Sequence, residues 1–189
     1  MMKNITKNIV LCFLLSCAVK SPLTGGPLDQ DSPYIIDTSP INGQTSLGEK
    51  ENIQIYFNEM IDANSVKSSI EISPKIDIIV NSYGKRISIK PRKSWPSQNE
   101  IKIKIKRSIS DYSGNNMNSS IILTYSTSDK ISSGSILGEV FNVDSLKYCT
   151  LGLYEINNDS LILYSSIESD NENKFSFNNL KNGEYFIIG

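Results

Sequence analysis

Four side chains with oxygen donors are the candidates for metal chemistry in the sequence. Glu59 and Asp62 lie three residues apart at the end of an apolar segment, and Asp111 and Asn115 lie four residues apart in a later turn. Calcium takes six to eight oxygen ligands, so these residues could supply several if their loops shared one end of the fold. Capping and turn formation account for the same residues without a metal. We therefore keep all four as weak metal candidates and expect no metal ion and no cofactor.

The composition limits the enzymatic chemistry that is available. None of the 189 residues is histidine, which excludes Ser-His-Asp and Cys-His arrangements and the HExxH zinc site. The sequence also lacks the GxxxxGK and GxGxxG patterns of phosphate-binding loops. The carboxylate pair of a glycoside hydrolase needs a cleft with two acids at a fixed separation, which small sandwiches seldom form. We expect a non-enzymatic protein with no catalytic residues.

A basic stretch runs from residue 85 to residue 107. It holds nine basic residues and one acidic residue, whereas the whole chain has 19 basic and 20 acidic residues. Lys102, Lys104 and Lys106, with Trp95 in the adjacent loop, could bind an anionic or carbohydrate partner. The alternative is that the lysines form solvated strand faces and that Trp95 caps a core. The charges gather on one surface if the flanking strands form a hairpin, and separate if the loop 91–99 crosses between two sheets.

The N-terminus predicts export and lipid attachment. A basic head with Lys3 and Lys7 precedes the apolar run 9–15, which is too short to span a bilayer. The segment Leu14-Leu15-Ser16-Cys17 that follows resembles the lipobox of bacterial lipoproteins, in which the cysteine is acylated and becomes the new N-terminus. The resemblance implies that residues 1–16 are a signal peptide and that Cys17 carries acyl chains such as palmitate. An ordinary signal peptide with an incidental cysteine is the alternative.

Residues 17–32 have no apolar periodicity and predict a flexible tether behind the lipid anchor. Several acyl chains hold a soluble domain at a membrane stably. By resemblance to enterobacterial sorting, Ala18 after the cysteine implies the outer membrane. We expect a lipid-anchored protein of the bacterial cell envelope. Its partners would be the membrane, through the acyl chains, and envelope glycans or other surface proteins, with no nucleic acid.

Alternation with a period of two residues dominates the sequence from residue 34 onward. Apolar residues occupy every second position in 53–57, 87–89 and 101–105, and again in 76–80 and 121–125. Because side chains alternate between the faces of a strand, each segment predicts a strand with one buried face. Clusters of Asn, Ser, Gly and Pro separate these segments, and none after the signal peptide has a sustained helical period. The pattern predicts an all-β protein built from antiparallel sandwiches.

Several short motifs follow one another in a fixed order. They are Ser39-Pro40 with Asn42-Gly43, then Phe57-Asn58-Glu59-Met60-Ile61-Asp62, then Ile87-x-Ile89-x-Pro91, and finally Asp111-x-x-Gly114-Asn115. In this order they resemble the bacterial Ig-like domains of the SbsA type. The resemblance covers residues 33–128 and implies an Ig-like antiparallel β-sandwich. In the last motif, Asp and Asn side chains suit a tight turn and Gly114 tolerates a left-handed backbone.

A second unit is expected at residues 134–189, after a short polar linker at 129–133. Its pattern Phe175-x-Phe177-x-x-Leu180-x-x-Gly183-x-Tyr185 is similar to the carboxypeptidase-regulatory-like, or transthyretin-like, β-sandwiches. The pattern stops at Gly189 without its closing strands, so we expect an incomplete sandwich, from either a truncated reading frame or a fragment of a longer lipoprotein. With Cys12 in the signal peptide and Cys17 acylated, Cys149 has no partner for a disulfide, and we expect it to be a small buried apolar residue.

Together these features predict a non-enzymatic, lipid-anchored envelope protein that acts as a structural spacer and as a binding or adhesion module. Two alternatives stay open. One is a carbohydrate- or polyanion-binding surface lipoprotein that uses the basic stretch and Trp95. The other is the N-terminal accessory region of a longer chain.

Overall fold

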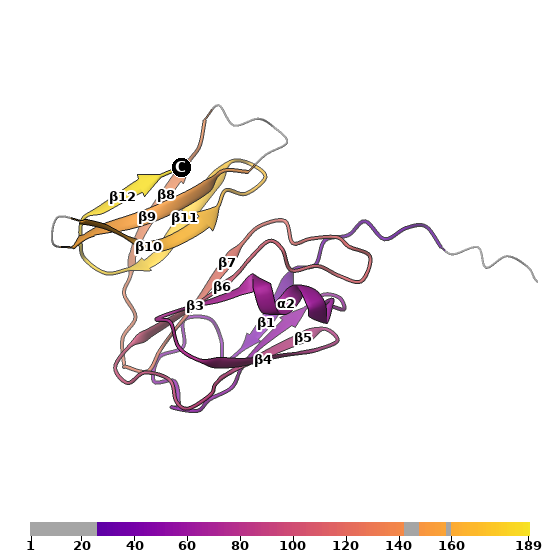
Figure 1. Ribbon diagram of the computed structural model, residues 1–189, viewed down its shortest axis with the longest axis horizontal. Helices are drawn as coiled ribbons and strands as arrows, with labels where there is room; N and C mark the ends of the chain where they lie inside the picture. The colour runs from indigo at the N-terminus through magenta and orange to yellow at the C-terminus, as the bar shows by residue number, and fades with distance from the viewer. Residues whose placement is uncertain (1–25, 142–147, 158–159) are drawn as a thin grey trace, which may run out of the picture.

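The computed structural model describes residues 26–141, 148–157 and 160–189 (Figure 1). The predicted signal peptide, Cys17 and most of the predicted tether lie outside the described residues, so lipid attachment stays a prediction. Within the described ranges, no helix has the length and hydrophobicity needed to cross a bilayer. The all-β prediction is confirmed, because antiparallel strands form nearly all of the regular structure and assemble into two sandwiches.

The first sandwich consists of two antiparallel sheets, with strand orders β1-β2-β5-β4 and β3-β6-β7. The loop between β1 and β2 covers the outer edge of β7, because Gly43 N donates to Thr124 O at 2.8 Å and Ser46 N donates to Ser128 O at 2.7 Å. Covering an edge strand in this way removes a site for unwanted strand pairing. The strands are β1 (Ile35–Ser39), β2 (Ile53–Phe57), β3 (Ile70–Ser73), β4 (Ile78–Tyr83), β5 (Arg86–Pro91), β6 (Glu100–Ile105) and β7 (Ile121–Ser126).

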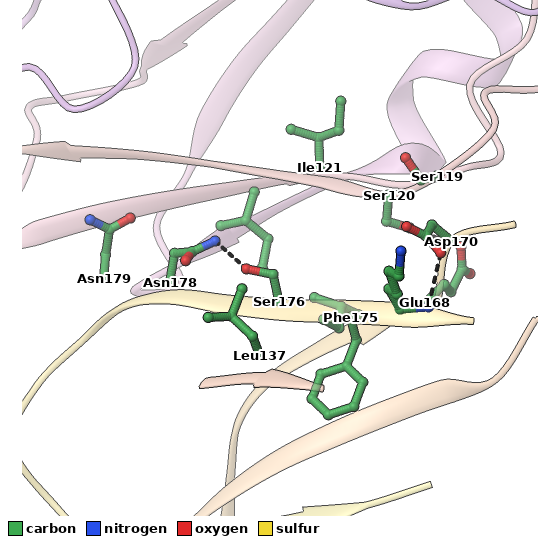
Figure 2. A pocket seen from close by; sticks show the side chains of 13 residues that line it. Ser119, Ser120, Ile121, Leu137, Glu168, Asp170, Phe175, Ser176, Asn178 and Asn179 are labelled. Carbon is green, nitrogen blue, oxygen red and sulfur yellow. Dashed lines mark hydrogen bonds between the residues drawn. The ribbon is translucent and has the colours of Figure 1, made fainter. Parts of the chain in front are cut away.

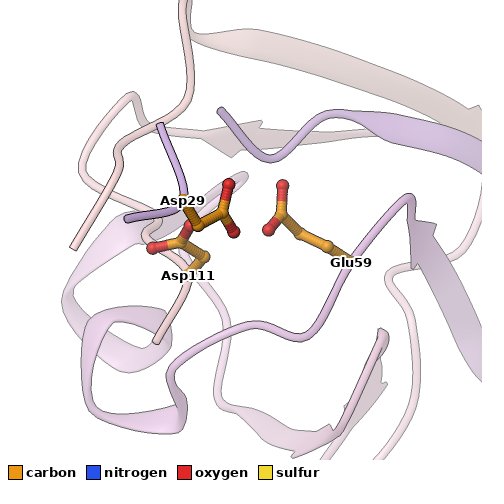
Figure 3. Close-up of side chains that lie close together, drawn as sticks. All are labelled: Asp29, Glu59 and Asp111. Carbon is orange, nitrogen blue, oxygen red and sulfur yellow. The ribbon is translucent and has the colours of Figure 1, made fainter. Parts of the chain in front are cut away.

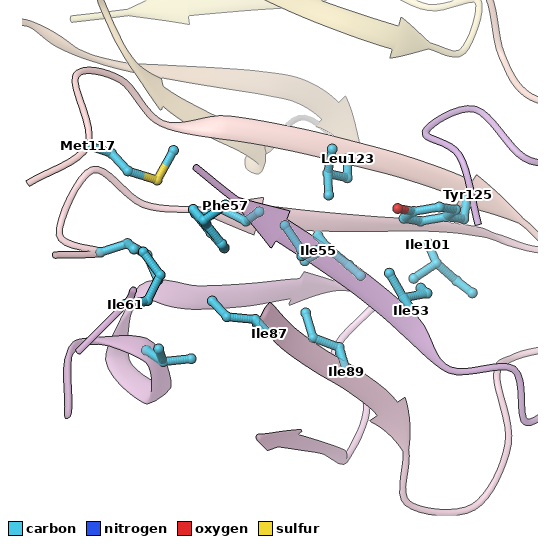
Figure 4. Close-up of a cluster of buried hydrophobic side chains, with 14 of the residues drawn as sticks. Ile53, Ile55, Phe57, Ile61, Ile87, Ile89, Ile101, Met117, Leu123 and Tyr125 are labelled. Atoms are coloured by element: carbon cyan, nitrogen blue, oxygen red, sulfur yellow. The ribbon is translucent and has the colours of Figure 1, made fainter. Parts of the chain in front are cut away.

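The alternating apolar residues form the core between these two sheets (Figure 4). The apolar residues of β2, β5 and β6 have no exposed surface at all, whereas their neighbours along each strand point to the outside. Tyr125 on β7 and Ile61 after β2 close the two ends of the same core. The period of two therefore identified the buried face of each strand correctly. The fully buried residues of the three strands are Ile53, Ile55, Phe57, Ile87, Ile89, Ile101, Ile103 and Ile105.

A short helix interrupts the strands, although the sequence pattern predicted none. Helix α2 (Ala63–Ser69) has seven residues, too few for a sustained helical period to be visible in the sequence. Asp62 caps its N-terminus, since the side chain accepts a hydrogen bond from Asn64 N at 3.0 Å. The helix buries Val66 and Ser69 against the sandwich and leads directly into β3.

The second sandwich packs a three-stranded sheet, β10-β9-β12, against a two-stranded sheet, β11-β8. Among the described residues, its core has five buried apolar residues, whereas that of the first sandwich has sixteen. Several apolar side chains stay exposed on its surface, among them Leu163 (54%), Phe186 (46%) and Ile188 (49%). The second sandwich therefore depends on few buried contacts. Its strands are β8 (Gly134–Glu139), β9 (Thr150–Asn157), β10 (Ser160–Glu168), β11 (Lys174–Leu180) and β12 (Tyr185–Ile188).

Candidate functional site

Three carboxylates meet at one end of the first sandwich (Figure 3). One oxygen each of Asp29, Glu59 and Asp111 lies within 4.8 Å of the other two. Glu59 follows β2, Asp111 lies in the connection between β6 and β7, and Asp29 comes from the segment before β1. Two of the sequence-derived candidates thus lie together. Asp29 was missed because it lies in the stretch that was predicted to be a flexible tether.

The other two metal candidates, Asp62 and Asn115, have structural roles. Asp62 serves as the N-cap of α2. Asn115 holds the turn together: its backbone N donates to Asp111 Oδ1 at 2.8 Å and its Nδ2 donates to Asp111 Oδ2, also at 2.8 Å. The same Nδ2 lies 3.1 Å from the carbonyl oxygen of Asp29. Asn115 therefore connects the turn to the N-terminal segment.

The environment of Asp111 favours its ionised form. Burial of this side chain, which is 3% exposed, raises its pKa, but hydrogen bonds outweigh that effect and leave the pKa below the ordinary value. The hydrogen bonds come from the Asn115 side chain and from the backbone of Asn115, Gly114 and Ser113. Gly114 has a φ of +90°, so the left-handed backbone expected of this turn is present. The turn presents its N–H groups to the carboxylate and keeps it charged.

The pKa of Glu59 is shifted in the opposite direction, above its ordinary value. Burial raises its pKa, and the negative charges of Asp111, Asp29 and Asp31 raise it further, although a hydrogen bond from Asn58 partly compensates. Three carboxylates so close together could supply part of the oxygen shell of a cation such as calcium. The hydrogen bonds of Asp111 already account for this residue as part of a turn. This agrees with the alternative that the candidate residues form turns and caps without a metal.

Replacing Asp111 with asparagine should lower the free energy of unfolding by about 1.5 to 3 kcal/mol at neutral pH, the usual contribution of hydrogen bonds to a charged group. Because the folded-state pKa of Asp111 is depressed, its contribution is complete above the unfolded-state pKa and disappears as pH falls through the folded-state pKa. The difference between wild type and Asp111→Asn should therefore shrink below about pH 4. Urea titrations of wild type and Asp111→Asn at several pH values measure this difference in the free energy of unfolding.

The matched control for this experiment is Asp77→Asn, which changes an exposed aspartate just before β4. It should shift the free energy of unfolding by no more than about 0.5 kcal/mol. A difference between Asp111→Asn and wild type that stayed constant from pH 7 to pH 3 would contradict the assigned ionisation.

The basic stretch is divided between the two sheets of the first sandwich. Strand β5, with Lys90, belongs to the four-stranded sheet, whereas β6, with Lys102 and Lys104, belongs to the three-stranded sheet. The loop between β5 and β6 therefore crosses from one sheet to the other, which is the alternative that separates the charges. Lys106 pairs with Glu71 at 2.5 Å. The stretch does not form one continuous cationic surface.

Trp95 is part of the core of the first sandwich. Its side chain is 2% exposed, and its Nε1 donates a hydrogen bond to Glu51 O at 2.8 Å. Its backbone N donates to Glu49 O at 2.7 Å. Because the ring is covered, Trp95 does not offer a surface on which a carbohydrate could stack, and its position agrees with the core-capping alternative.

Lys102 and Lys104 lie between the two sandwiches. The outer face of the β3-β6-β7 sheet lies against the second sandwich, as the arrangement in Figure 1 indicates. Lys102 Nζ donates to Tyr164 Oη at 3.1 Å and to Asn179 O at 2.8 Å. Lys104 Nζ donates to Ser166 Oγ at 2.9 Å. Two of the three lysines that the sequence suggested as ligand-binding residues thus bind the second sandwich.

A groove of about 370 Å³ runs along the same contact, between β7 and the sheet of β8 and β11 (Figure 2). At one end, Ser120 Oγ donates to Glu168 at 2.8 Å across the contact. Farther along, Asn178 Nδ2 donates to Ser176 Oγ at 2.6 Å within β11. Polar side chains in the groove therefore bond to one another, and the bond from Ser120 to Glu168 joins the two sandwiches.

Comparison with solved structures found weak similarities, two of which follow. An L,D-transpeptidase from Mycobacterium smegmatis is similar with a TM-score of 0.38 and 15% identity, over 55% of this chain and 43% of that chain. The LD transpeptidase LdtMt1 in complex with imipenem gives a TM-score of 0.36 and 14% identity, over 67% and 62%. The chain spans less than two thirds of the length of either protein. No curated protein matches the sequence.

A family model supplies the assignment. The model described as "Bacterial Ig-like domain" matches residues 29–127, which is more than half of the chain and includes both sheets of the first sandwich. The match agrees with the Ig-like resemblance of the sequence motifs and with the observed antiparallel sandwich. The chain belongs to the bacterial Ig-like domain family.

Proposed function

We propose that the protein is a non-enzymatic, lipid-anchored module of the bacterial cell envelope, which acts as a structural spacer and as a binding or adhesion module. Family membership is the observation that carries the proposal, because this is a family of non-catalytic Ig-like domains that occur in bacterial surface proteins. The lipobox-like segment that ends at Cys17 supports the anchor. The likeness of the second sandwich to transthyretin-like domains is part of the same proposal.

Contacts between the two sandwiches support the role of a spacer. Besides the lysine contacts, Arg107 Nη2 donates to Asn171 Oδ1 at 2.8 Å, and the Arg107 guanidinium lies 4.2 Å from the ring centre of Tyr148. In the linker, Asn179 Nδ2 donates to Ser132 O at 3.2 Å, and Ser132 donates from N and Oγ to Glu100 Oε1 at 2.7 and 2.6 Å. Bonds on both sides of the linker restrict rotation of one sandwich against the other. A body of this kind can hold a binding surface at a fixed distance from a membrane.

Replacing Cys17 with serine should abolish membrane attachment, because it removes the thiol that would carry the acyl chains. Wild-type protein from its native envelope is expected to partition into the detergent phase of a Triton X-114 separation, and Cys17→Ser into the aqueous phase. Mass spectrometry of the N-terminal peptide should find acyl chains on Cys17 of the wild type.

The matched control is Cys149→Ser, which removes the free cysteine of the described part of the chain and leaves the proposed anchor intact. This variant should partition with the wild type. Aqueous partitioning of the wild type, with an unmodified Cys17 thiol, would rule out the lipid anchor.

A further inference from the structure

Strand β6 brings two lysines into the contact between the sandwiches. Lys102 and Lys104 lie two residues apart and so point to the same face of the sheet. The side chain of Lys104 is only 15% exposed. Lys102 Nζ also lies 4.7 Å from the ring centre of Tyr164 on β10. Both ammonium groups are therefore shielded from bulk water by the second sandwich.

Nearby carboxylates balance these two charges incompletely. Glu71 lies 4.0 Å from Lys104 Nζ but 2.5 Å from Lys106 Nζ, so it pairs mainly with Lys106. Among the described residues, no carboxylate lies within ion-pair distance of Lys102. Burial lowers the pKa of both Lys102 and Lys104, although negative charges on Glu100, for Lys102, and on Glu71 and Glu168, for Lys104, oppose that effect. A shielded ammonium group without a close counter-charge is costly, and an anion beside it would reduce that cost.

A cavity of about 170 Å³ opens between the same two lysines and β10. Its polar lining includes Ser73, Ser165 and Ser166, together with the acidic residue Glu71, whose carboxylate pairs with Lys106. An ammonium group has three N–H donors, and the contacts to the second sandwich use two of them on Lys102 and one on Lys104. Pockets for drug-sized ligands measure about 300 to 1,000 Å³, so this one suits a single small group.

We propose that this cavity binds one small oxyanion group, a phosphate monoester or a carboxylate carried by a larger molecule, between Lys102, Lys104 and the serine hydroxyls. The site goes beyond the spacer role and does not depend on the lipid anchor. It also differs from a cationic stripe for polymers, because the cavity is small and lies between the two sandwiches.

Amide NMR of the full chain in detergent tests the proposal, with inorganic phosphate and acetate as the two probes and chloride used to keep the ionic strength constant. Phosphate, acetate or both should cause saturable shifts at Ser73, Ser165 and Ser166. Saturation by phosphate alone identifies a phosphate monoester, and saturation by acetate alone identifies a carboxylate. Lys104→Gln should weaken the binding at least tenfold, whereas Lys102→Arg, which keeps the charge, should retain most of it.

Lys90→Gln is the matched control, because Lys90 is an exposed lysine on β5 in the opposite sheet. It should leave the affinity unchanged. Chemical-shift dispersion in both sandwiches confirms that each variant is folded. The proposal is overturned if neither probe gives saturable shifts in the wild type, or if Lys90→Gln weakens binding as much as Lys104→Gln, which would indicate general charge screening.

Discussion

Replacing Trp95 with alanine is expected to lower the free energy of unfolding of the first sandwich by about 3 to 5 kcal/mol. The ring is 2% exposed and belongs to the core cluster between the two sheets, so its removal leaves a large cavity lined by apolar side chains. A domain of this size has a total stability of about 5 to 15 kcal/mol. The variant should therefore unfold at a much lower urea concentration, which NMR signals from residues 33–128 would measure.

Trp95→Phe is the matched variant that separates packing from hydrogen bonding. Phenylalanine keeps most of the buried apolar surface but removes the Nε1 donor to Glu51 O. The loss of this hydrogen bond should cost about 0.5 to 1.5 kcal/mol, the usual net contribution of an intramolecular hydrogen bond. If the free energy of unfolding of Trp95→Ala lay within about 0.5 kcal/mol of the wild-type value, the ring would not contribute to the core. Trp95 would then again be a candidate ligand contact.

The sequence predicted the first sandwich well because its strands follow a local rule. In β6, Ile101, Ile103 and Ile105 alternate with lysines, and the isoleucines are buried as expected. The turn from Asp111 to Asn115 was also predictable, because its residue types determine a local backbone conformation. Such features depend on neighbours within a few residues along the chain.

The parts that the sequence did not predict depend on distant residues. Lys102 and Lys104 were expected on an open surface, yet their partners Tyr164, Ser166 and Asn179 are 62 to 77 residues away in the chain. Period-two alternation identifies the outward face of a strand, but it does not reveal whether another domain covers that face. For Trp95 the sequence left a core cap and a ligand contact open; the core-capping alternative agrees with the structure, in which the hydrogen-bond acceptor Glu51 O lies 44 residues away.

Replacing Phe177 with alanine should unfold the second sandwich while the first stays folded. Phe177 is 1% exposed and is the largest of the five buried core residues that the structure describes in this sandwich. Phe→Ala substitutions in cores cost about 3 to 5 kcal/mol, and small domains have little stability to lose. The first sandwich has a separate core, and what joins the two is the packing of Ile122 from β7 against the second core together with polar contacts of Lys102 and Lys104. Amide signals from residues 134–189 should lose their dispersion, and those from residues 33–128 should keep it.

Phe186→Ala is the control, because this phenylalanine belongs to the same sandwich but is 46% exposed. It should change the free energy of unfolding by no more than about 0.5 kcal/mol. In Phe177→Ala the covering of Lys102 and Lys104 would be lost, so the pKa values of both lysines should rise toward that of a solvated lysine. If Phe177→Ala unfolded both sandwiches together, the polar contact would have to contribute more stability than its few hydrogen bonds suggest. The two sandwiches would then act as one cooperative unit, with Lys102 and Lys104 as part of what joins them.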